Sequence, residues 1–329
     1  SAVVLALLLV GASARANETI VALDPSVTYQ EIEGFGASLT DSSAYVLRYG
    51  LSAAARSNLL QQLFCPTNGI GLNFLRQPIG SSDFRRQDYT YNDMPAGQTD
   101  YALTNFSIAY DTNYIIPLLK QVATLNTNLK IMGTPWSPPA WMKTTTNLYS
   151  GQLRTNAYTA YAAYLRKFAQ AYQSNGLPVH YLTVQNEPLY EPNTYAGSYM
   201  AASNQIALIK AVGADFATNG LSTKLIVYDH NWDQFQYPIS VLNDAGAAAY
   251  AAGSAFHGYA GDVSAQSLVH DAHPTKDIYF TECSSGTWSG SFSNSLLWDA
   301  QTLIIGAIRN WSKTVIKWNV ALDQNGGPK

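Results

Sequence analysis

The sequence predicts an α/β fold in which eight parallel strands close into a (β/α)8 TIM barrel. Between Glu31 and Asp323, short apolar runs alternate with longer amphipathic stretches, which is the pattern of repeated βα units. Eight such apolar runs are present, and each is followed by polar or aromatic residues at its C-terminal end. In a barrel of this class, the C-terminal ends of the strands converge on the active site.

The eight expected strands are separated by segments long enough to form helices. In chain order they are Ile32–Ala37, Gly71–Pro78, Lys130–Thr134, Tyr181–Gln185, Lys224–Tyr228, Ser254–His257, Ile278–Thr281 and Val315–Val320. The clearest helical patterns are Ala157–Gln173 and Tyr199–Phe216. A doubly wound sheet is the alternative fold. However, Gly34-Phe35-Gly36 lacks the third glycine of a dinucleotide-binding turn.

Composition narrows the functional class. Of the 329 residues, 47% are apolar and only 12% are charged, which excludes a disordered chain. The net charge is -3 and no basic stretch is present, so we expect no nucleic-acid partner. Cys65 and Cys283 lack the paired spacing of a zinc site, and no motif for a metal or a cofactor is found.

The two ends of the chain predict export and an incomplete domain. Residues 1–16 resemble a signal peptide that lacks its basic N-terminal region, with an apolar run closed by Ala14-Arg15-Ala16. A membrane anchor is the alternative, but the run is about half the roughly 20 residues that cross a bilayer. We therefore expect a secreted protein without stable membrane insertion. Residues 17–30 suggest an extended segment of an accessory sheet, and we expect the barrel, residues 31–329, to be incomplete at its C-terminus.

Two carboxylates directly follow apolar strands, where acidic residues are uncommon. Glu187 ends the fourth expected strand and Glu282 ends the seventh. These strands lie across the barrel mouth from one another, so both carboxylates can face one cleft. A pair of this kind serves glycosidic bond cleavage, with about 5 Å between the groups in retaining enzymes and about 6.5–9.5 Å in inverting enzymes. The sequence leaves that separation open, and salt bridges at the barrel rim are the structural alternative.

Several longer motifs extend this interpretation. From about Tyr29 to the last residue, the chain resembles glycoside hydrolase family 30, whose members are retaining (β/α)8 glycosidases. The motifs that carry the resemblance are Glu33–Asp41, Ser82-Asp83-Phe84, Thr134–Lys143, Asn186-Glu187-Pro188, Tyr228–Asp233 and Trp318-Asn319. The resemblance also implies an accessory β-sandwich, of which this chain would contain only a part.

The resemblance assigns roles to individual residues. It implies Glu187 as the acid/base and Glu282 as the nucleophile. It also implies a substrate-binding set and a supporting arginine, namely Asp83, Trp136, Asn186, His257, Tyr259, Trp318 and Arg76. Each of these has a structural alternative, such as a turn cap for Asp83, core packing for a tryptophan or a buried core position for His257. Asp229 and His230 suggest a metal pair but lack a third ligand at fixed spacing.

The substrate is predicted less directly. The family includes glucosylceramidases, endo-β-1,6-glucanases, β-xylosidases and glucuronoxylanases. In the animal glucosylceramidase pattern the sixth strand ends in His-Trp-Tyr, whereas this chain has His257-Gly258-Tyr259. We interpret Gly258 as the loss of an aromatic wall of the cleft, which favours β-1,6-glucan. Glucosylceramide is the alternative substrate, and a non-catalytic glycan-binding protein is a second alternative.

The two carboxylates must differ in protonation for this chemistry. The hypothesis from the sequence is that burial and the charge of Glu282 raise the pKa of Glu187. Donors such as Arg76 would hold Glu282 ionised.

Overall fold

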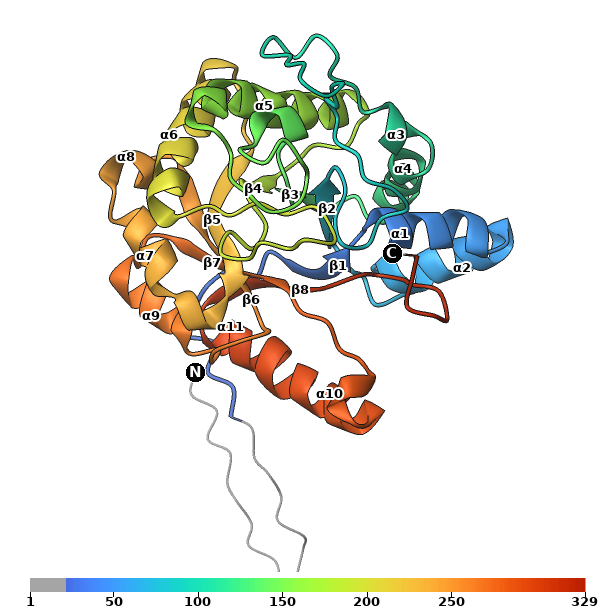
Figure 1. The fold of residues 1–329 in the computed structure, drawn as a ribbon. Helices are drawn as coiled ribbons and strands as arrows, with labels where there is room; N and C mark the ends of the chain where they lie inside the picture. The colour runs from blue at the N-terminus through green and yellow to red at the C-terminus, as the bar shows by residue number, and fades with distance from the viewer. Residues whose placement is uncertain (1–21, 329) are drawn as a thin grey trace, which may run out of the picture.

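The computed structural model describes residues 22–328, whose centre is a closed barrel of eight strands in chain order (Figure 1). Neighbouring strands are parallel, and β1 pairs with β8 to close the barrel. The strands are β1 Gly34–Ser38, β2 Phe74–Ile79, β3 Lys130–Pro135, β4 Tyr181–Thr183, β5 Lys224–Asn231, β6 Ala251–His257, β7 Asp277–Glu282 and β8 Ser312–Lys317. The predicted TIM barrel is confirmed.

Helices surround the barrel on its outer side (Figure 1). The α-helices are α1 Asp41–Tyr45, α2 Ala53–Phe64, α3 Ala109–Thr112, α4 Ile115–Leu125, α5 Tyr158–Ser174, α6 Ala202–Thr218, α7 Gln236–Leu242, α8 Ala245–Ala248, α9 Ala265–Ala272, α10 Phe292–Trp298 and α11 Ala307–Arg309. Shorter 3-10 and π segments are η1 Val46–Gly50, η2 Ala140–Met142, η3 Thr155–Ala157, η4 Trp232–Gln234, η5 Thr287–Ser289 and η6 Asp299–Gly306. Among the described residues, no helix is long and apolar enough to cross a membrane.

The interior of the barrel contains an apolar layer built from alternating strand residues. Because successive side chains of a strand point to opposite faces, one residue from each of seven strands fills this layer. They are Phe74, Met132, Tyr181, Ile226, Ala255, Tyr279 and Ile316. β1 contributes Gly36, where a β-carbon would lie 1.6 Å from the backbone oxygen of Phe74. The strand residues that point outward pack against the helices in the main hydrophobic core.

A polar layer lies directly above the apolar one, toward the C-terminal ends of the strands. Two residues beyond each apolar-layer residue, the same alternation places Arg76 on β2, Thr183 on β4, His257 on β6 and Thr281 on β7, all of them buried. In β5 the register with β6 shifts between Tyr228 and His230. This irregularity turns Asp229 into the polar layer, while Tyr228 packs in the outer core. The candidate site is built on this layer.

Most of the predicted elements agree with the structure. All eight strands are found, and helices α5 and α6 cover most of the two predicted helical segments. The last strand, predicted at Val315–Val320, begins three residues earlier at Ser312, because Lys313 at its polar start pairs with Glu33 and Asp277.

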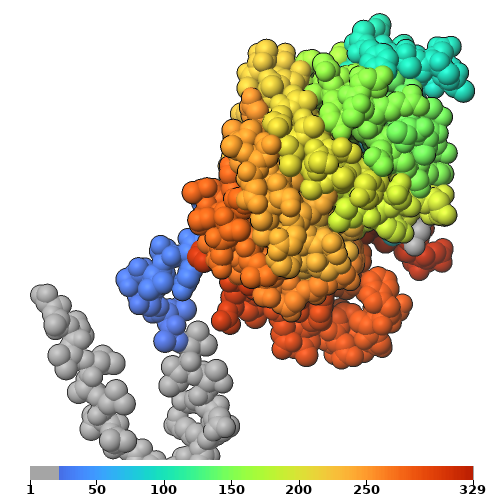
Figure 2. Space-filling view, turned by 60° about the vertical axis from the view of Figure 1, so that its left-hand side comes forward, coloured from blue at the N-terminus to red at the C-terminus, as the bar shows by residue number. Residues whose placement is uncertain are grey.

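The predicted signal peptide, residues 1–16, lies outside the described residues. The predicted accessory strand segment, residues 17–30, is described only from residue 22, and residues 22–30 contain no strand. Residues 22–29 are exposed and stand off the barrel in blue (Figure 2).

Candidate active site

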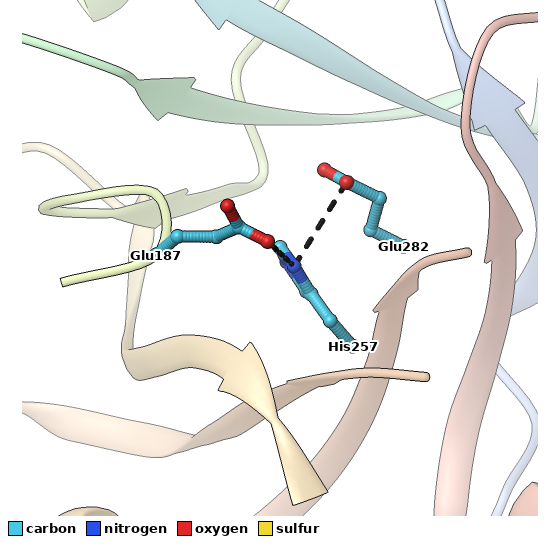
Figure 3. A group of neighbouring side chains, drawn as sticks. All are labelled: Glu187, His257 and Glu282. Carbon is cyan, nitrogen blue, oxygen red and sulfur yellow. Dashed lines mark hydrogen bonds and ion pairs between the residues drawn. The ribbon is translucent and has the colours of Figure 1, made fainter. Parts of the chain in front are cut away.

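Glu187 and Glu282 lie on opposite sides of the barrel mouth with His257 between them (Figure 3). One carboxylate oxygen of each glutamate and one ring nitrogen of His257 all lie within 4.8 Å of one another. The side chain of Glu187 is 17% exposed and that of Glu282 is 7% exposed. A short separation between two nearly buried carboxylates is typical of a retaining glycosidase pair.

Glu282 accepts hydrogen bonds at both of its oxygens. Arg76, fully buried on β2, donates Nη1 to Oε2, and Tyr259 donates its hydroxyl to Oε1 at 3.0 Å. His257 Nδ1 lies 3.9 Å from the same Oε1. These contacts fix the carboxylate in one orientation at the end of β7.

Asp229 connects the supporting residues. Its carboxylate is fully buried and accepts a hydrogen bond from each of four side chains on four other strands. The donors are Arg76 at 3.0 Å, Thr183 at 2.8 Å, His257 at 3.1 Å and Thr281 at 2.7 Å. Each carboxylate oxygen receives two of them, so the acceptor capacity of this buried charge is well used.

The backbone around the site is held in unusual conformations. Glu187 has φ +44° and Asp229 has φ +74°, values that cost non-glycine residues roughly 1–3 kcal/mol. The two strained residues are linked, because Glu187 donates its N–H to the carbonyl of Asp229 at 3.0 Å. Asn186 donates its N–H to the carbonyl of Pro135 at 2.8 Å, and its Oδ1 accepts from Arg76 at 2.6 Å. Together these bonds aim the Glu187 side chain into the mouth.

Aromatic rings form one wall beside the carboxylates. Trp136 and Trp318 are buried and stacked, with ring centroids 5.1 Å apart. The Arg76 guanidinium lies 4.9 Å from the Trp136 ring and 5.7 Å from the Trp318 ring. Asp83 accepts a hydrogen bond from Trp318, but burial and the charge of Glu282 raise its pKa to about 7. Flat rings beside a carboxyl group suit the binding of a sugar ring.

The pKa of His257 depends on the charged groups packed around it. Burial lowers the pKa of His257, but the charge of Glu282 and the hydrogen bonds to Asp229 and Glu187 raise it to about 9 overall. The imidazole is therefore protonated at neutral pH, and it donates to both Asp229 and Glu187.

The pKa values of the two glutamates move in opposite directions. Burial raises the pKa of Glu187, but the hydrogen bond from His257 and the nearby positive charges outweigh burial and lower it. Burial also raises the pKa of Glu282, which stays raised although His257 and Arg76 act against burial. In the substrate-free site these directions are opposite to the hypothesis from the sequence, because that hypothesis placed no cation against Glu187.

Comparison with known proteins agrees with this geometry. The sequence profile of the glycosyl hydrolase family 30 TIM-barrel domain matches residues 32–329. The chain belongs to this family. It is 37% identical over 92% of its length to an endo-1,6-beta-D-glucanase of Neurospora crassa. It is 34% identical over 93% of its length to a putative glucosylceramidase 2 of Caenorhabditis elegans.

Among solved structures, the endo-beta1,6-glucanase BT3312 is 35% identical to this family 30 chain. The two superimpose with a TM-score of 0.87 over 93% of this chain and 69% of that one. The chain spans 63% of the length of the Neurospora crassa relative and 62% of the Caenorhabditis elegans relative.

The structure brings together every site residue that the sequence predicted. Arg76 contacts both Glu282 and Asp229, so it pairs with the expected carboxylate and with a second, fully buried one. His257 is a buried histidine and also contacts Glu187. Cys283 is buried in the outer core.

Sequence reasoning missed the role of Asp229 and the position of Tyr195. Asp229 lies in one of the motifs that carry the resemblance, but the sequence does not indicate that it supports its neighbours, because the irregularity that turns it inward has no sequence signature. Tyr195 packs against the stacked tryptophans, and burial, together with the charges of Asp83 and Glu187, raises the pKa of its hydroxyl. Its position eight residues after Glu187 is the only sequence signal that could have suggested it.

The interpretation of Gly258 as a lost wall of the cleft stays a prediction. A β-carbon at this position would lie 3.2 Å from ring atoms of Phe280 and Trp232 and 3.4 Å from the sulfur of Cys283. Gly258 and Cys283 also line a hollow beside Tyr259, so a larger side chain at this position would press on the outer core or take up part of that hollow.

Glu187, His257 and Glu282 also form a set of potential metal ligands. In this arrangement Arg76 already contacts Glu282, and the protonated His257 donates to Glu187 instead of offering a lone pair. The site therefore supplies its own positive charge to the two carboxylates.

Proposed function

We propose that this chain is the catalytic barrel of a secreted retaining β-glycoside hydrolase that cleaves β-1,6-glucan. The observation that carries the proposal is that one carboxylate oxygen of Glu187 and one of Glu282 lie within 4.8 Å of each other, which suits double displacement better than an inverting mechanism with a water between the groups. The relatives named endo-1,6-beta-D-glucanase, at 33–37% identity, support the choice of glucan.

In the first step, a carboxylate oxygen of Glu282 attacks the anomeric carbon. The bond from that carbon to the glycosidic oxygen breaks, and Glu187 gives its proton to the departing oxygen. The hydrogen bonds from Arg76 and Tyr259 hold the attacking carboxylate in line. Asn186 lies where its amide can bond the sugar 2-hydroxyl, a contact that strengthens in the transition state.

In the second step, Glu187 takes a proton from water, and the water oxygen attacks the anomeric carbon and releases Glu282. Glu282 has lost its charge in the ester, so the pKa of Glu187 is lower at this stage and suits a base. In the substrate-free site the bond to His257 favours the ionised form of Glu187. In this proposal Glu187 becomes protonated when the glycosidic oxygen replaces His257 as its partner.

Secretion belongs to the same proposal. It is supported by the predicted signal peptide at residues 1–16. Glucosylceramide is the second candidate substrate, and the glucosylceramidases among the relatives, at 29–34% identity, favour it. A purely glycan-binding role is disfavoured because both carboxylates face the same space.

The deciding experiment offers β-1,6-glucan and glucosylceramide to the purified protein and follows the anomer of the first product by NMR. We expect cleavage of the glucan with the β-anomer appearing first, because two inversions retain the configuration. An initial α-anomer would refute double displacement. Release of ceramide without cleavage of glucan would reverse the order of the two substrates.

The roles of the two glutamates are tested separately. Glu282→Gln should lower kcat by at least about 10⁴-fold, since no nucleophile remains. Added azide should rescue Glu187→Ala to give a β-glycosyl azide and Glu282→Gly to give an α-glycosyl azide. Near wild-type turnover by Glu282→Gln would remove this residue from the mechanism.

A further inference from the structure

A hollow beside the carboxylate pair is not used by the mechanism above. It has a volume of about 290 Å³, close to the lower end of small-molecule sites, and lies under the segment that joins β7 to α10. Its lining includes Tyr259, Ser284, Ser285, Trp288, Ser289 and Trp298.

The hollow and the active site share one side chain. Tyr259 lines the hollow, and its hydroxyl donates to Glu282 at 3.0 Å and accepts the Ser284 N–H at 3.2 Å. The hollow is therefore one side chain away from the candidate nucleophile.

The position of the hollow around the barrel indicates which part of the substrate it faces. Asp83 and Trp136 follow β2 and β3, whereas Tyr259 and Ser284 follow β6 and β7, on the opposite side of an eight-stranded barrel. If the attacked sugar rests on Trp136 and Asp83, the rest of the substrate extends toward Tyr259. The hollow is thus on the leaving-group side of the scissile bond.

The side chains of the hollow combine exposed rings with fixed polar groups. Trp288 is 74% exposed and Trp298 is 39% exposed, so indole surface is available to a ligand. The polar groups of the hollow include Ser285, whose hydroxyl donates to Asp299 at 2.8 Å and accepts from Lys317 at 2.6 Å. An aromatic face beside positioned hydroxyls and charges suits a sugar, whose ring has an apolar face and whose hydroxyl groups can bond these polar side chains.

We propose that this hollow binds the glucosyl unit on the leaving-group side of the scissile bond, with Trp288 as its stacking platform. The inference rests on the proposed function and deepens it, because it names the part of the enzyme that recognises a glucan leaving group.

The test compares two substrates that differ only in the leaving group. A β-1,6-linked glucose tetrasaccharide has a sugar leaving group, whereas β-gentiobiosyl fluoride has a single atom. For Trp288→Ala, the ratio of kcat/KM on the tetrasaccharide to kcat/KM on the fluoride should fall about tenfold, as expected for a lost stacking contact. Trp288→Phe should recover most of this ratio, because it restores an aromatic face.

Phe292→Ala is the matched control. This residue is an exposed aromatic on α10 that does not line the hollow, so its ratio should stay at the wild-type value. An unchanged ratio for Trp288→Ala, or an equal loss on both substrates, would overturn the proposal. A loss on glucosylceramide alone would overturn it in favour of a lipid. If the wild-type protein cleaves neither the fluoride nor the tetrasaccharide, the proposed function itself fails.

Discussion

Asp229 is fully buried, so it influences a bound substrate only through the residues that it holds. Its four hydrogen bonds reach Arg76, Thr183, His257 and Thr281, and two of these donors are cations that face the carboxylate pair. The negative charge of Asp229 contributes to the raised pKa of His257. Asp229 is therefore a positioning residue that sets both the orientation and the charge of its neighbours.

Replacing Asp229 by Asn keeps the shape but removes this charge. The pKa of His257 would then fall. Glu187 and Glu282 would still face the ring, and so would Arg76, His230 and Tyr259. We expect Asp229→Asn to lower kcat by about 10–100-fold and to move the alkaline limb of the kcat/KM profile to lower pH. The limb moves to lower pH because His257 stays protonated only up to its pKa, and removing the charge of Asp229 lowers that pKa.

The control for this prediction is Thr281→Val, which removes one neutral donor to Asp229 without changing any charge. Its alkaline limb should stay in place. If Asp229→Asn lowers kcat but leaves the limb unmoved, Asp229 acts on geometry alone.

At the scale of single residues, a site residue could be predicted from the sequence when it directly follows an apolar strand. Glu187 and Glu282 could be found because an acid after an apolar run is unusual. Asp229 could not be placed, because its inward direction depends on a shift of register between β5 and β6.

At the scale of elements, Lys143 connects two loops of the aromatic wall. Its fully buried amino group donates to the hydroxyl of Ser137 at 2.9 Å and to the carbonyls of Leu148 and Gly197 at 2.7 and 2.6 Å. Leu148 and Ala196, next to Gly197, pack on the stacked tryptophans. Lys143 thus fixes the loops after β3 and β4 against the aromatic wall.

Lys143→Met should release these loops. Two carbonyls and a hydroxyl would be buried without a donor, at a cost of about 2–4 kcal/mol of the free energy of unfolding. We expect KM for the glucan to rise about tenfold while kcat changes less, since the carboxylate pair is built on other residues. Steady-state kinetics and thermal melting measure the two effects.

The matched variant is Lys143→Arg, which keeps the charge and the donors on a longer side chain. It should recover part of the stability and part of the affinity. A fall in kcat at unchanged KM for Lys143→Met would contradict the assigned role.

The strands were the most predictable elements, because each combines apolar residues with a polar C-terminal end. The loops were not predictable, since hydrogen bonds such as those of Lys143 join positions up to 54 residues apart. The strand boundaries depend on long-range contacts as well. The polar start of β8 is stabilised by the pairing of Lys313 with Glu33, which no local pattern indicates.

At the scale of the whole molecule, Glu33 joins distant parts of the barrel. It lies just before β1 and pairs with Lys130 on β3 and with Lys313 on β8, at 3.2 Å in the second case. Burial raises the pKa of Glu33, but the hydrogen bonds from Lys130, Tyr181 and Lys313 lower it to about 2 overall. The end of the barrel opposite the active site is therefore closed by one ionised carboxylate.

Glu33→Gln should lower the free energy of unfolding at pH 7 by about 1–2 kcal/mol, after allowance for solvent screening. The folded carboxyl titrates below the unfolded one, so the wild-type advantage is present above about pH 4.5. It is lost as the pH falls toward about 2. Urea unfolding of both proteins across this range measures the difference.

Asp277→Asn serves as the comparison. Of Lys130 and Lys313, Asp277 contacts only Lys313, and its side chain is more exposed than that of Glu33. Its effect should be smaller than that of Glu33→Gln. A difference between wild type and Glu33→Gln that stays constant down to pH 2 would show that the charge of Glu33 does not contribute.

The apolar layer that fills the barrel beneath the polar layer closes the site from below. Under the proposed function, the glucan, the departing sugar and the water that completes a turnover therefore all meet at the barrel mouth. Under the proposed mechanism, water therefore competes for the covalent intermediate with any sugar that still occupies the hollow beside Tyr259. The partition between hydrolysis and chain lengthening then depends on how long that sugar stays, and at high glucan concentration the products should shift toward longer oligosaccharides.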